Sequence, residues 1–231
     1  MLHIKPTLTG RILLVTGVLA LSLGVGACAE TRKTGSPTMH GFLGDYSQLS
    51  KDTSGRVTLI YVNPAADWRS YNAIMIDSVT LWKSSSTSKQ LSPKDAQMLT
   101  DHFYDALHDE LGKTFRIVDR PGIGVMRVRG AITEAKGAIV PVNVATTLHG
   151  GAKVATTVVG VATDTQIWVG KATFEGEVRD SVSDVQLMAA VDERAGAKNI
   201  LVGLRKWSEV KRALDTWAEN LSERLSELRG K

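Results

Sequence analysis

The chain has 231 residues, and its 28 lysines and arginines against 24 aspartates and glutamates give a formal net charge of +4 at pH 7. Lys5 and Arg11 precede residue 28, so the remainder carries only +2. A charge this small gives no basis for nucleic-acid binding, and the length suits one domain with a sizeable core.

Residues 1–27 have the parts of a secretory signal: Lys5 and Arg11 at the basic end, an apolar run from Ile12 to Val25, and small residues before Cys28. The end of this run resembles the lipobox of bacterial lipoproteins, in which the cysteine receives a fatty acid such as palmitate on sulfur. We therefore predict cleavage after residue 27 and lipidation of Cys28. The alternatives are a plain signal peptide and an uncleaved anchor.

Cys28 is the only cysteine of the chain. If its thiol carries a lipid, none remains for a disulfide, a cysteine nucleophile or a thiolate metal site. In lipoproteins of this type an aspartate after the cysteine commonly retains the protein at the inner membrane, and here the residue is Ala29. In a Gram-negative cell we expect a protein that is lipid-anchored at the outer membrane and faces the periplasm.

Residues 28–40 are polar and rich in turn formers, which predicts a lipidated flexible tether before a periplasmic domain over residues 41–231. Alternation predicts a first strand at Arg56–Val62, which Asn63 and Pro64 end. The stretch from Tyr71 to Trp82 is apolar on both faces, which favours a strand at the centre of a sheet.

The clearest helix signal follows at residue 92. Ser92 is a suitable N-cap, Pro93 suits the first turn, and Gly112 suits the end of a helix. Between them, one apolar stripe consists of Ala96, Leu99, Phe103, Leu107 and Leu111. Strands are expected at 115–118 and 124–134, which together with the preceding strand and this helix make a crossover unit.

The segment from Lys171 to Arg179 alternates between small or apolar residues and polar ones, and 180–184 has the composition of a hairpin turn into a strand at 185–191. A long amphipathic helix closes the chain, and it packs on its own sheet or presents a seam to a partner. Its apolar positions are Val210, Leu214, Trp217, Leu221, Leu225 and Leu228. The predicted class is α+β: a single domain with a mixed, mostly antiparallel sheet and two main helices packed on it.

An unusual segment runs from Gly137 to Thr163 with Lys153 as its one formal charge. It is either a hairpin or a pair of short helical turns, and it either folds over the core or forms a contact surface. Its candidate interaction residues are Val144, Leu148 and Val158.

No catalytic motif is present, and neither an enzymatic activity nor a cofactor or metal is expected. The best cluster is on the first helix, where Asp101, Asp105 and Asp109 recur beside His102 and His108. Carboxylates at this spacing are typical of a solvated face. A second candidate, Asp192-Glu193-Arg194, follows an apolar strand and favours a buried ion pair over catalysis.

Tryptophan serves both cores and interfaces. Trp217 lies on the apolar stripe of the last helix, whereas Trp68 and Trp82 stand at the edges of turn-like segments and are candidate interaction residues.

Several segments together resemble the bacterial lipoproteins grouped as domain-of-unknown-function family 3313: residues 41–49, 61–67, 91–93 and 191–196, with Trp207. The resemblance covers nearly all of the chain after the signal, and it implies a lipid-anchored envelope protein with no assigned activity. The expected function is a non-enzymatic interaction or accessory module that binds another envelope protein. The alternative is a carrier of a small apolar ligand or lipid, which requires an enclosed pocket.

Overall fold

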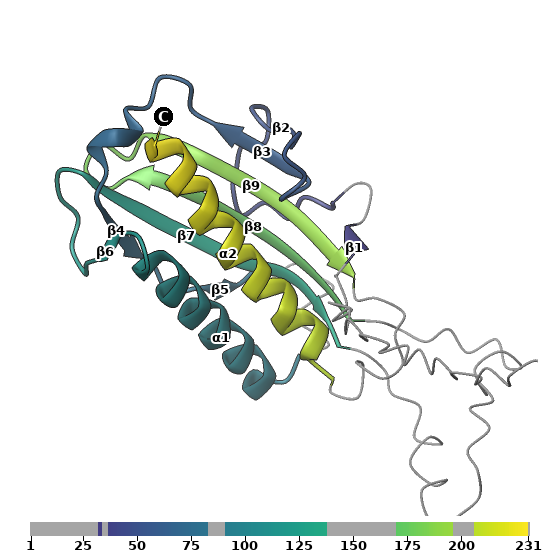
Figure 1. The fold of residues 1–231 in the computed structure, drawn as a ribbon. Coiled ribbons are helices and arrows are strands. Elements are labelled where there is room, and N and C mark those ends of the chain that lie inside the picture. The colour runs from purple at the N-terminus through teal and green to yellow at the C-terminus, as the bar shows by residue number, and fades with distance from the viewer. Residues whose placement is uncertain (1–31, 34–36, 83–90, 138–169, 196–205, 231) are drawn as a thin grey trace, which may run out of the picture.

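The computed structural model describes residues 32–33, 37–82, 91–137, 170–195 and 206–230. They form a curved sheet with two helices side by side on one face (Figure 1). The α+β class with a mixed, largely antiparallel sheet is confirmed. The elements in chain order are β1 (Arg32–Lys33), β2 (Ser50–Lys51), β3 (Leu59–Val62), the 3-10 helix η1 (Trp68–Ser70), β4 (Ala73–Ile76), β5 (Thr80–Leu81), α1 (Pro93–Gly112), β6 (Arg116–Ile117), β7 (Val125–Lys136), β8 (Lys171–Asp180), β9 (Gln186–Ala195) and α2 (Ser208–Gly230).

The strand order is β2-β3-β9-β8-β7-β4-β6, with β1 paired to β9 and β5 to β7. The three long strands β7, β8 and β9 are antiparallel neighbours, whereas β4 pairs in parallel with both β6 and β7. The prediction that Tyr71–Trp82 is the centre of the sheet is wrong, because β8 lies there. Asp77 divides the apolar run into β4 and β5, and its carboxylate lies 2.8 Å from the guanidinium of Arg127.

The first helix begins and ends as the sequence predicts. The Ser92 hydroxyl accepts a hydrogen bond from the backbone N–H of Asp95 at 3.1 Å, Pro93 occupies the first turn, and Gly112 is the last helical residue. This cap satisfies one of the N–H groups that a helix start leaves without a partner. The stripe then packs into the core through Leu99, Phe103, Leu107 and Leu111.

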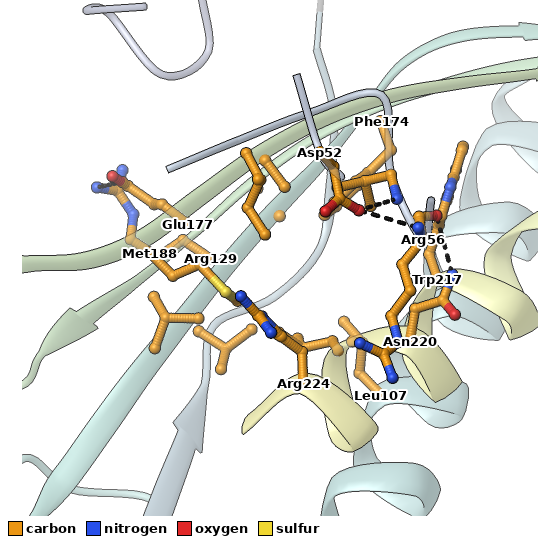
Figure 2. Close-up of a pocket in the computed structure, with 18 of the residues that line it drawn as sticks. Asp52, Arg56, Leu107, Arg129, Phe174, Glu177, Met188, Trp217, Asn220 and Arg224 are labelled. Carbon is orange, nitrogen blue, oxygen red and sulfur yellow. Dashed lines mark hydrogen bonds and ion pairs between the residues drawn. The ribbon is translucent and has the colours of Figure 1, made fainter. Parts of the chain in front are cut away.

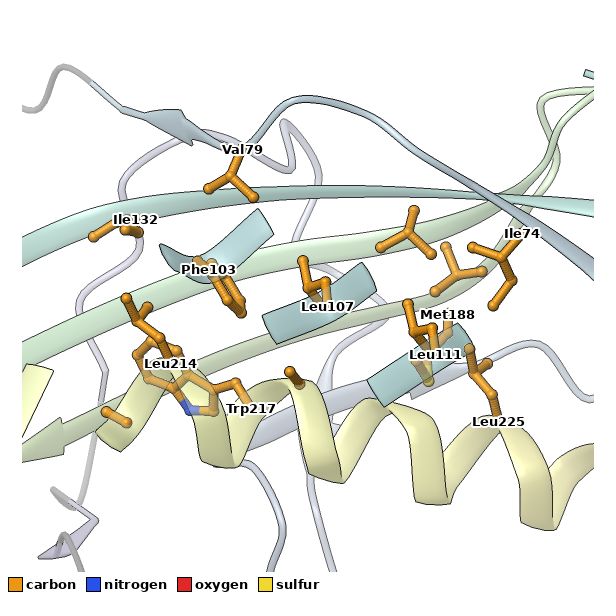
Figure 3. Packing of buried hydrophobic residues seen from close by; sticks show 14 of the residues in the cluster. Ile74, Val79, Phe103, Leu107, Leu111, Ile132, Met188, Leu214, Trp217 and Leu225 are labelled. Carbon is orange, nitrogen blue, oxygen red and sulfur yellow. The ribbon is translucent and has the colours of Figure 1, made fainter. Parts of the chain in front are cut away.

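The last helix packs on its own sheet and against α1 (Figure 3), which confirms the expected packing. Between the sheet and the two helices, the ring of Phe174 in β8 lies between Phe103 of α1 and Trp217 of α2, whose ring centroids are 5.3 and 5.2 Å away. Phe174 lies over two glycines that pair across β7 and β8, Gly130 and Gly176. A Cβ at Gly176 would overlap the ring, so the aromatic side chain fills the space that the glycines leave.

The other face of the sheet is polar in sequence but covered in the structure. Thr173, Glu175 and Glu177 alternate along β8 on this face, and all three are buried. Residues 40–46 cross over Glu175, whose carboxylate accepts hydrogen bonds from the backbone N–H groups of His40 at 2.6 Å and Phe42 at 3.0 Å. The N-terminal segment therefore forms a second layer over this part of the sheet.

We call this arrangement the Glu175 clasp: Glu175 with the backbone of residues 40–43 and the side chain of Tyr46. The Tyr46 hydroxyl donates to the carboxylate at 2.5 Å and accepts from the N–H of Gly41 at 2.6 Å. Burial and the hydrogen bond to Glu175 raise the pKa of Tyr46 to about 12. The buried carboxylate is thus surrounded by donors, as a buried charge requires.

In the part of the chain that the structure describes, neither helix is long and apolar enough to cross a membrane. The predicted signal and lipidation site lie outside the described residues, as does the segment 138–163 of the uncharged stretch. Within the predicted tether, Arg32–Lys33 form the short strand β1.

Candidate functional site

Two loops meet at the end of the sheet where β7 begins and β8 ends. The N–H of Gly122 donates to the Ser181 hydroxyl at 3.1 Å, and this hydroxyl lies 3.1 Å from the Gly122 carbonyl. The N–H of Ser181 also donates to the carbonyl of Val125 at 3.1 Å. The loop 121–124 and the turn 181–185 therefore form one continuous surface, the distal end of the sheet.

This surface exposes three aliphatic side chains. Ile123 is 100% exposed, Val182 66% and Val185 49%, among only five large hydrophobic residues that are exposed in the described residues. We call these three residues the apolar tip. Exposed apolar residues gathered on adjoining loops, rather than scattered singly, are typical of a surface that contacts a partner.

The turn that carries Val182 is held by the carboxylate of Asp180. It accepts hydrogen bonds from the N–H groups of Val182 at 3.0 Å and Ser183 at 2.7 Å, and from the Tyr71 hydroxyl at 2.9 Å. The hydrogen bond from the N–H of Ser183 is the main cause that lowers the pKa of Asp180. Burial and the hydrogen bond to Asp180 raise the pKa of Tyr71 to about 12.

Backbone geometry fixes the neighbouring loop as well. Gly124 has φ +72°, and a Cβ at this residue would lie 2.8 Å from the carbonyl oxygen of Ser70. Only glycine fits this approach. Because both loops have a fixed conformation, a partner that contacts the apolar tip would pay little ordering entropy.

A second exposed apolar surface lies on the far side of the sheet from the helices, beside the Glu175 clasp. The Trp82 indole N–H donates to the carbonyl of His40 at 2.9 Å, and its ring packs edge-on against Phe42 with centroids 5.4 Å apart. Trp82 is 37% exposed and Met39 48%. We call these two residues the Met39–Trp82 patch.

The other candidate interaction residues from the sequence are placed differently or not described. Trp68 lies in η1 at the distal end, half-buried and packed against the main core, so it supports the fold more than it offers a surface. Val144, Leu148 and Val158 lie outside the described residues, as does Cys28.

A small cavity lies between α2, the loop 52–57 and the sheet (Figure 2). Its volume is about 50 Å³, and Figure 2 shows Arg56, Asn220 and Arg224 on the helix and loop side and Phe174 and Met188 on the sheet side. Pockets that enclose an organic ligand are typically about 300–1,000 Å³. This volume is far below what a carrier of an apolar ligand requires.

A shallow groove of about 510 Å³ lies at the β6 edge of the sheet, between the ends of β4 and β6 and Tyr104 of α1. It opens to solvent and has a largely polar lining that includes Asp77 and Asp119. The carboxylate of Asp77 is occupied by an ion pair with Arg127, and Asp119 is exposed to solvent.

The acidic face of α1 is solvated, as its spacing predicts. Asp101, Asp105 and Asp109 are exposed, and the imidazole of His102 turns instead to α2, where its Nε2 lies 2.7 Å from the carboxylate of Asp215. Among the described residues, no three histidine, cysteine or acidic side chains come together in a way that could hold a metal ion.

The Asp192 carboxylate forms the buried ion pair that the sequence favours, within β9 rather than after it. It accepts from the Arg194 guanidinium at 2.8 Å, the Trp217 indole at 2.7 Å and the Thr58 hydroxyl at 2.6 Å. Arg194 in turn donates to the carbonyl of Arg56 at 2.7 Å. The pair joins β9, α2 and the loop 52–58, which is a structural role.

Sequence reasoning missed the apolar tip, although signals were present. Val182 is the one apolar residue inside a polar hairpin turn, and Ile123 stands between two glycines after a proline. Neither position belongs to a strand or helix face that packing could cover. An apolar side chain at the centre of a turn is the pattern that would have indicated an exposed surface.

Comparisons with known proteins give a family and several similar folds. The model of a family described as a protein of unknown function (DUF3313) matches residues 38–221. The chain is 26% identical to the uncharacterized lipoprotein YdcL of Escherichia coli K12 over 203 residues, which cover 83% of this chain and 84% of the relative.

Among solved structures, similarity extends to the PelC dodecamer from Paraburkholderia phytofirmans, with a TM-score of 0.39 and 11% identity over 71% of this chain and 94% of that one. Protein XCC0632 from Xanthomonas campestris has a TM-score of 0.37 and 8% identity over 72% of this chain and 93% of the other. A likeness of this degree gives no ground for a shared function.

Proposed function

The chain belongs to the DUF3313 family of proteins of unknown function, and from this premise we propose that it is a lipid-anchored envelope lipoprotein that binds another envelope protein through its apolar tip. The anchor is Cys28, at the end of a lipobox-like run, and a curated relative of similar length is a lipoprotein. Ala29 after the cysteine favours the outer membrane, with the domain in the periplasm.

The observation that carries the binding role is the exposure of Ile123, Val182 and Val185 on two loops that are locked together. An aliphatic cluster costs solubility when it faces water, and this one is held rigidly outward rather than folded back. Charged residues surround it, including Arg120 and Asp184, both exposed. An apolar centre with a polar rim is the usual anatomy of a protein–protein contact.

The charges beside the tip have both signs, since Asp119 and Asp184 are exposed there and so is Arg120. A rim of mixed charge can pair with the charges of a partner protein, whereas attraction to anionic phospholipids requires an excess of basic residues. We therefore propose a partner with an exposed apolar surface on an envelope protein. The role is non-enzymatic, which fits the occupation of the buried carboxylates Glu175 and Asp192 by structural hydrogen bonds.

Site-specific photocrosslinking in cells tests the binding role. A photoreactive amino acid at Val182 should yield a defined protein adduct, and the same probe at Glu219, which is exposed on α2, is the matched control. Adding Ile123→Ser should remove the adduct at Val182, and because Ile123 is fully exposed this change should leave stability within about 0.5 kcal/mol of the parent. An adduct that persists with Ile123→Ser, or equal labelling at both positions, would count against the tip.

The anchor has a separate test. Metabolic labelling with a fatty acid should mark the protein, and Cys28→Ser should abolish the label and release the protein from membranes. Label that remains on the Cys28→Ser variant would show that the anchor has been assigned to the wrong residue.

A further inference from the structure

The chain enters the fold at the end of the sheet opposite the apolar tip. In β1, Arg32 pairs with Ala195 and Lys33 with Arg194, at the end of β9. Ala195 also pairs with Lys171 at the start of β8, and Lys171 pairs with Lys136 at the end of β7. These strand ends form one row, which we call the proximal end.

Only a few residues, which we call the leash, separate Arg32 at this end from Cys28, the predicted site of the lipid. Arg32 is four residues after Cys28, so the two Cα atoms can be no more than about 14 Å apart, whatever the conformation between them. The inference rests on the lipid anchor of the proposed function. Given that anchor, Arg32 must lie within about 14 Å of the acylated residue, which places the end of the sheet that contains β1 next to the bilayer surface.

The Met39–Trp82 patch lies in the proximal half of the sheet. The backbone N–H of Trp82 donates to the carbonyl of Ile132 at 2.9 Å, and Ile132 pairs with Phe174 across β7 and β8. Phe174 is three residues after Lys171, which places this level about 10 Å along the strand from the proximal row. The apolar tip, at the other end of β8, is about 30 Å from the same row.

The chemistry of the patch suits the polar boundary of a bilayer. The indole N–H of Trp82 already has a partner in the carbonyl of His40, so the exposed part of the ring can enter an apolar layer without leaving a donor unsatisfied. Tryptophan is enriched at this boundary because its ring is apolar and its N–H is polar. Met39, which precedes His40 in the chain, adds an exposed and flexible apolar side chain.

Two lysines at the proximal end are the more exposed partners of their ion pairs. Lys136 and Lys171 lie 2.6 to 3.0 Å from the carboxylates of Glu134 and Glu193, which are buried, whereas both lysines are partly exposed. The two lysines balance the two carboxylates in charge, so this group does not repel the anionic headgroups of a phospholipid bilayer.

We propose that the Met39–Trp82 patch and the proximal lysines rest on the phospholipid bilayer that holds the lipid of Cys28. The domain is then docked at a fixed orientation rather than swinging on its leash. Its sheet points away from the membrane, and the apolar tip is presented to its partner at a distance set by the length of β8.

Spin labelling in vesicles tests this orientation, because Cys28 is the only natural cysteine and the proposed lipid would block its thiol. Acylated mature protein with Met39→Cys, or separately with Val182→Cys, is labelled with a nitroxide and reconstituted into phosphatidylethanolamine–phosphatidylglycerol vesicles. Both side chains are exposed, so both variants should fold. The accessibility of each label to oxygen, which concentrates in lipid, is compared with its accessibility to a water-soluble nickel chelate.

The oxygen-to-nickel accessibility ratio should be several-fold higher at residue 39 than at residue 182, and Trp82→Asp should lower it at residue 39 to the value at residue 182. Equal ratios at the two positions in protein that floats with the vesicles would overturn the proposal and leave the anchor intact. Spin–spin broadening at residue 39 with low access to both reagents would instead assign the patch to a second copy of the chain, which also overturns it. Failure to float with the vesicles would refute the anchor itself.

Discussion

Replacing Glu175 with glutamine should destabilise the domain strongly, although the change removes only a charge. The carboxylate is fully buried and accepts from the N–H groups of His40 and Phe42, more distantly from that of Leu43 at 3.4 Å, and from the Tyr46 hydroxyl. A glutamine side chain keeps one oxygen but turns an NH2 group toward these donors. At least one buried donor then loses its partner and another meets a donor at close range.

The expected loss follows from the kind of bonds involved. Each hydrogen bond to a charged group contributes about 1.5–3 kcal/mol, and an orphaned buried donor costs about 1–3 kcal/mol. The contributions are not additive, because residues 40–46 can detach and let water satisfy the donors. We expect a loss of about 3–4 kcal/mol in the free energy of unfolding for Glu175→Gln. For a domain of this size that corresponds to a fall in Tm of about 6–16 °C.

Urea denaturation followed by tryptophan fluorescence measures this loss. Glu219→Gln is the matched control, since Glu219 is exposed on α2 and its change should leave stability within about 0.5 kcal/mol of the parent. Limited proteolysis should also cut the Glu175→Gln variant faster within residues 37–58. A loss below about 1 kcal/mol with unchanged proteolysis would refute the assignment of the clasp as the main hold on the N-terminal layer.

Three further predictions concern other parts of the molecule. The pKa values of Tyr46 and Tyr71 are raised from 10.0 to about 12 in the folded protein. Their contribution to stability is therefore complete below pH 10 and should be lost as the pH rises toward 12. Urea unfolding at alkaline pH and absorbance titration of the Tyr→Phe variants can measure this loss. Gly176→Ala should destabilise by about 1–3 kcal/mol in the same urea assay, because the Cβ would overlap the Phe174 ring, which is packed on both sides. Asp180→Ala should lower the free energy of unfolding by about 1–2 kcal/mol at pH 7. Because the pKa of Asp180 in the folded protein lies below 3.8, the difference between the variant and the parent should vanish as the pH falls through that lowered value. A constant difference down to pH 2 would contradict this prediction.

Local signals predicted the helices well. The bounds of α1 followed from Ser92, Pro93 and Gly112, because capping depends on residues that are adjacent in sequence. The apolar stripe of α2 predicted its packing for the same reason. The strands between Tyr71 and Trp82 were harder, because an apolar run gives no information on its place in a sheet. That place depends on pairing with β7, which lies about 50 residues further along the chain.

The alternation of residues along β8 correctly separated its two faces, but it indicated that the polar face is exposed to solvent, which is wrong. Glu175 and Glu177 stand at positions that are normally solvated, and both are buried. Their partners lie far away in sequence: the N–H of His40 is 135 residues from Glu175, and Arg129 is 48 residues from Glu177. No local pattern can indicate that a carboxylate is covered when the cover comes from another part of the chain.

Within the described ranges, the segments that carry the family resemblance form hydrogen bonds between distant parts of the fold and do not line a cleft. Residues 41–46 form the Glu175 clasp, Asn63 bonds to the start of β9 at the distal end, and Asp192 with Arg194 ties β9 to α2. Since β8 and β9 extend between the two ends of the sheet, these contacts join β1 to the apolar tip through one continuous sheet. If the proximal end rests on the bilayer as we propose, the length of these strands, about 30 Å, sets the height of the tip above the membrane.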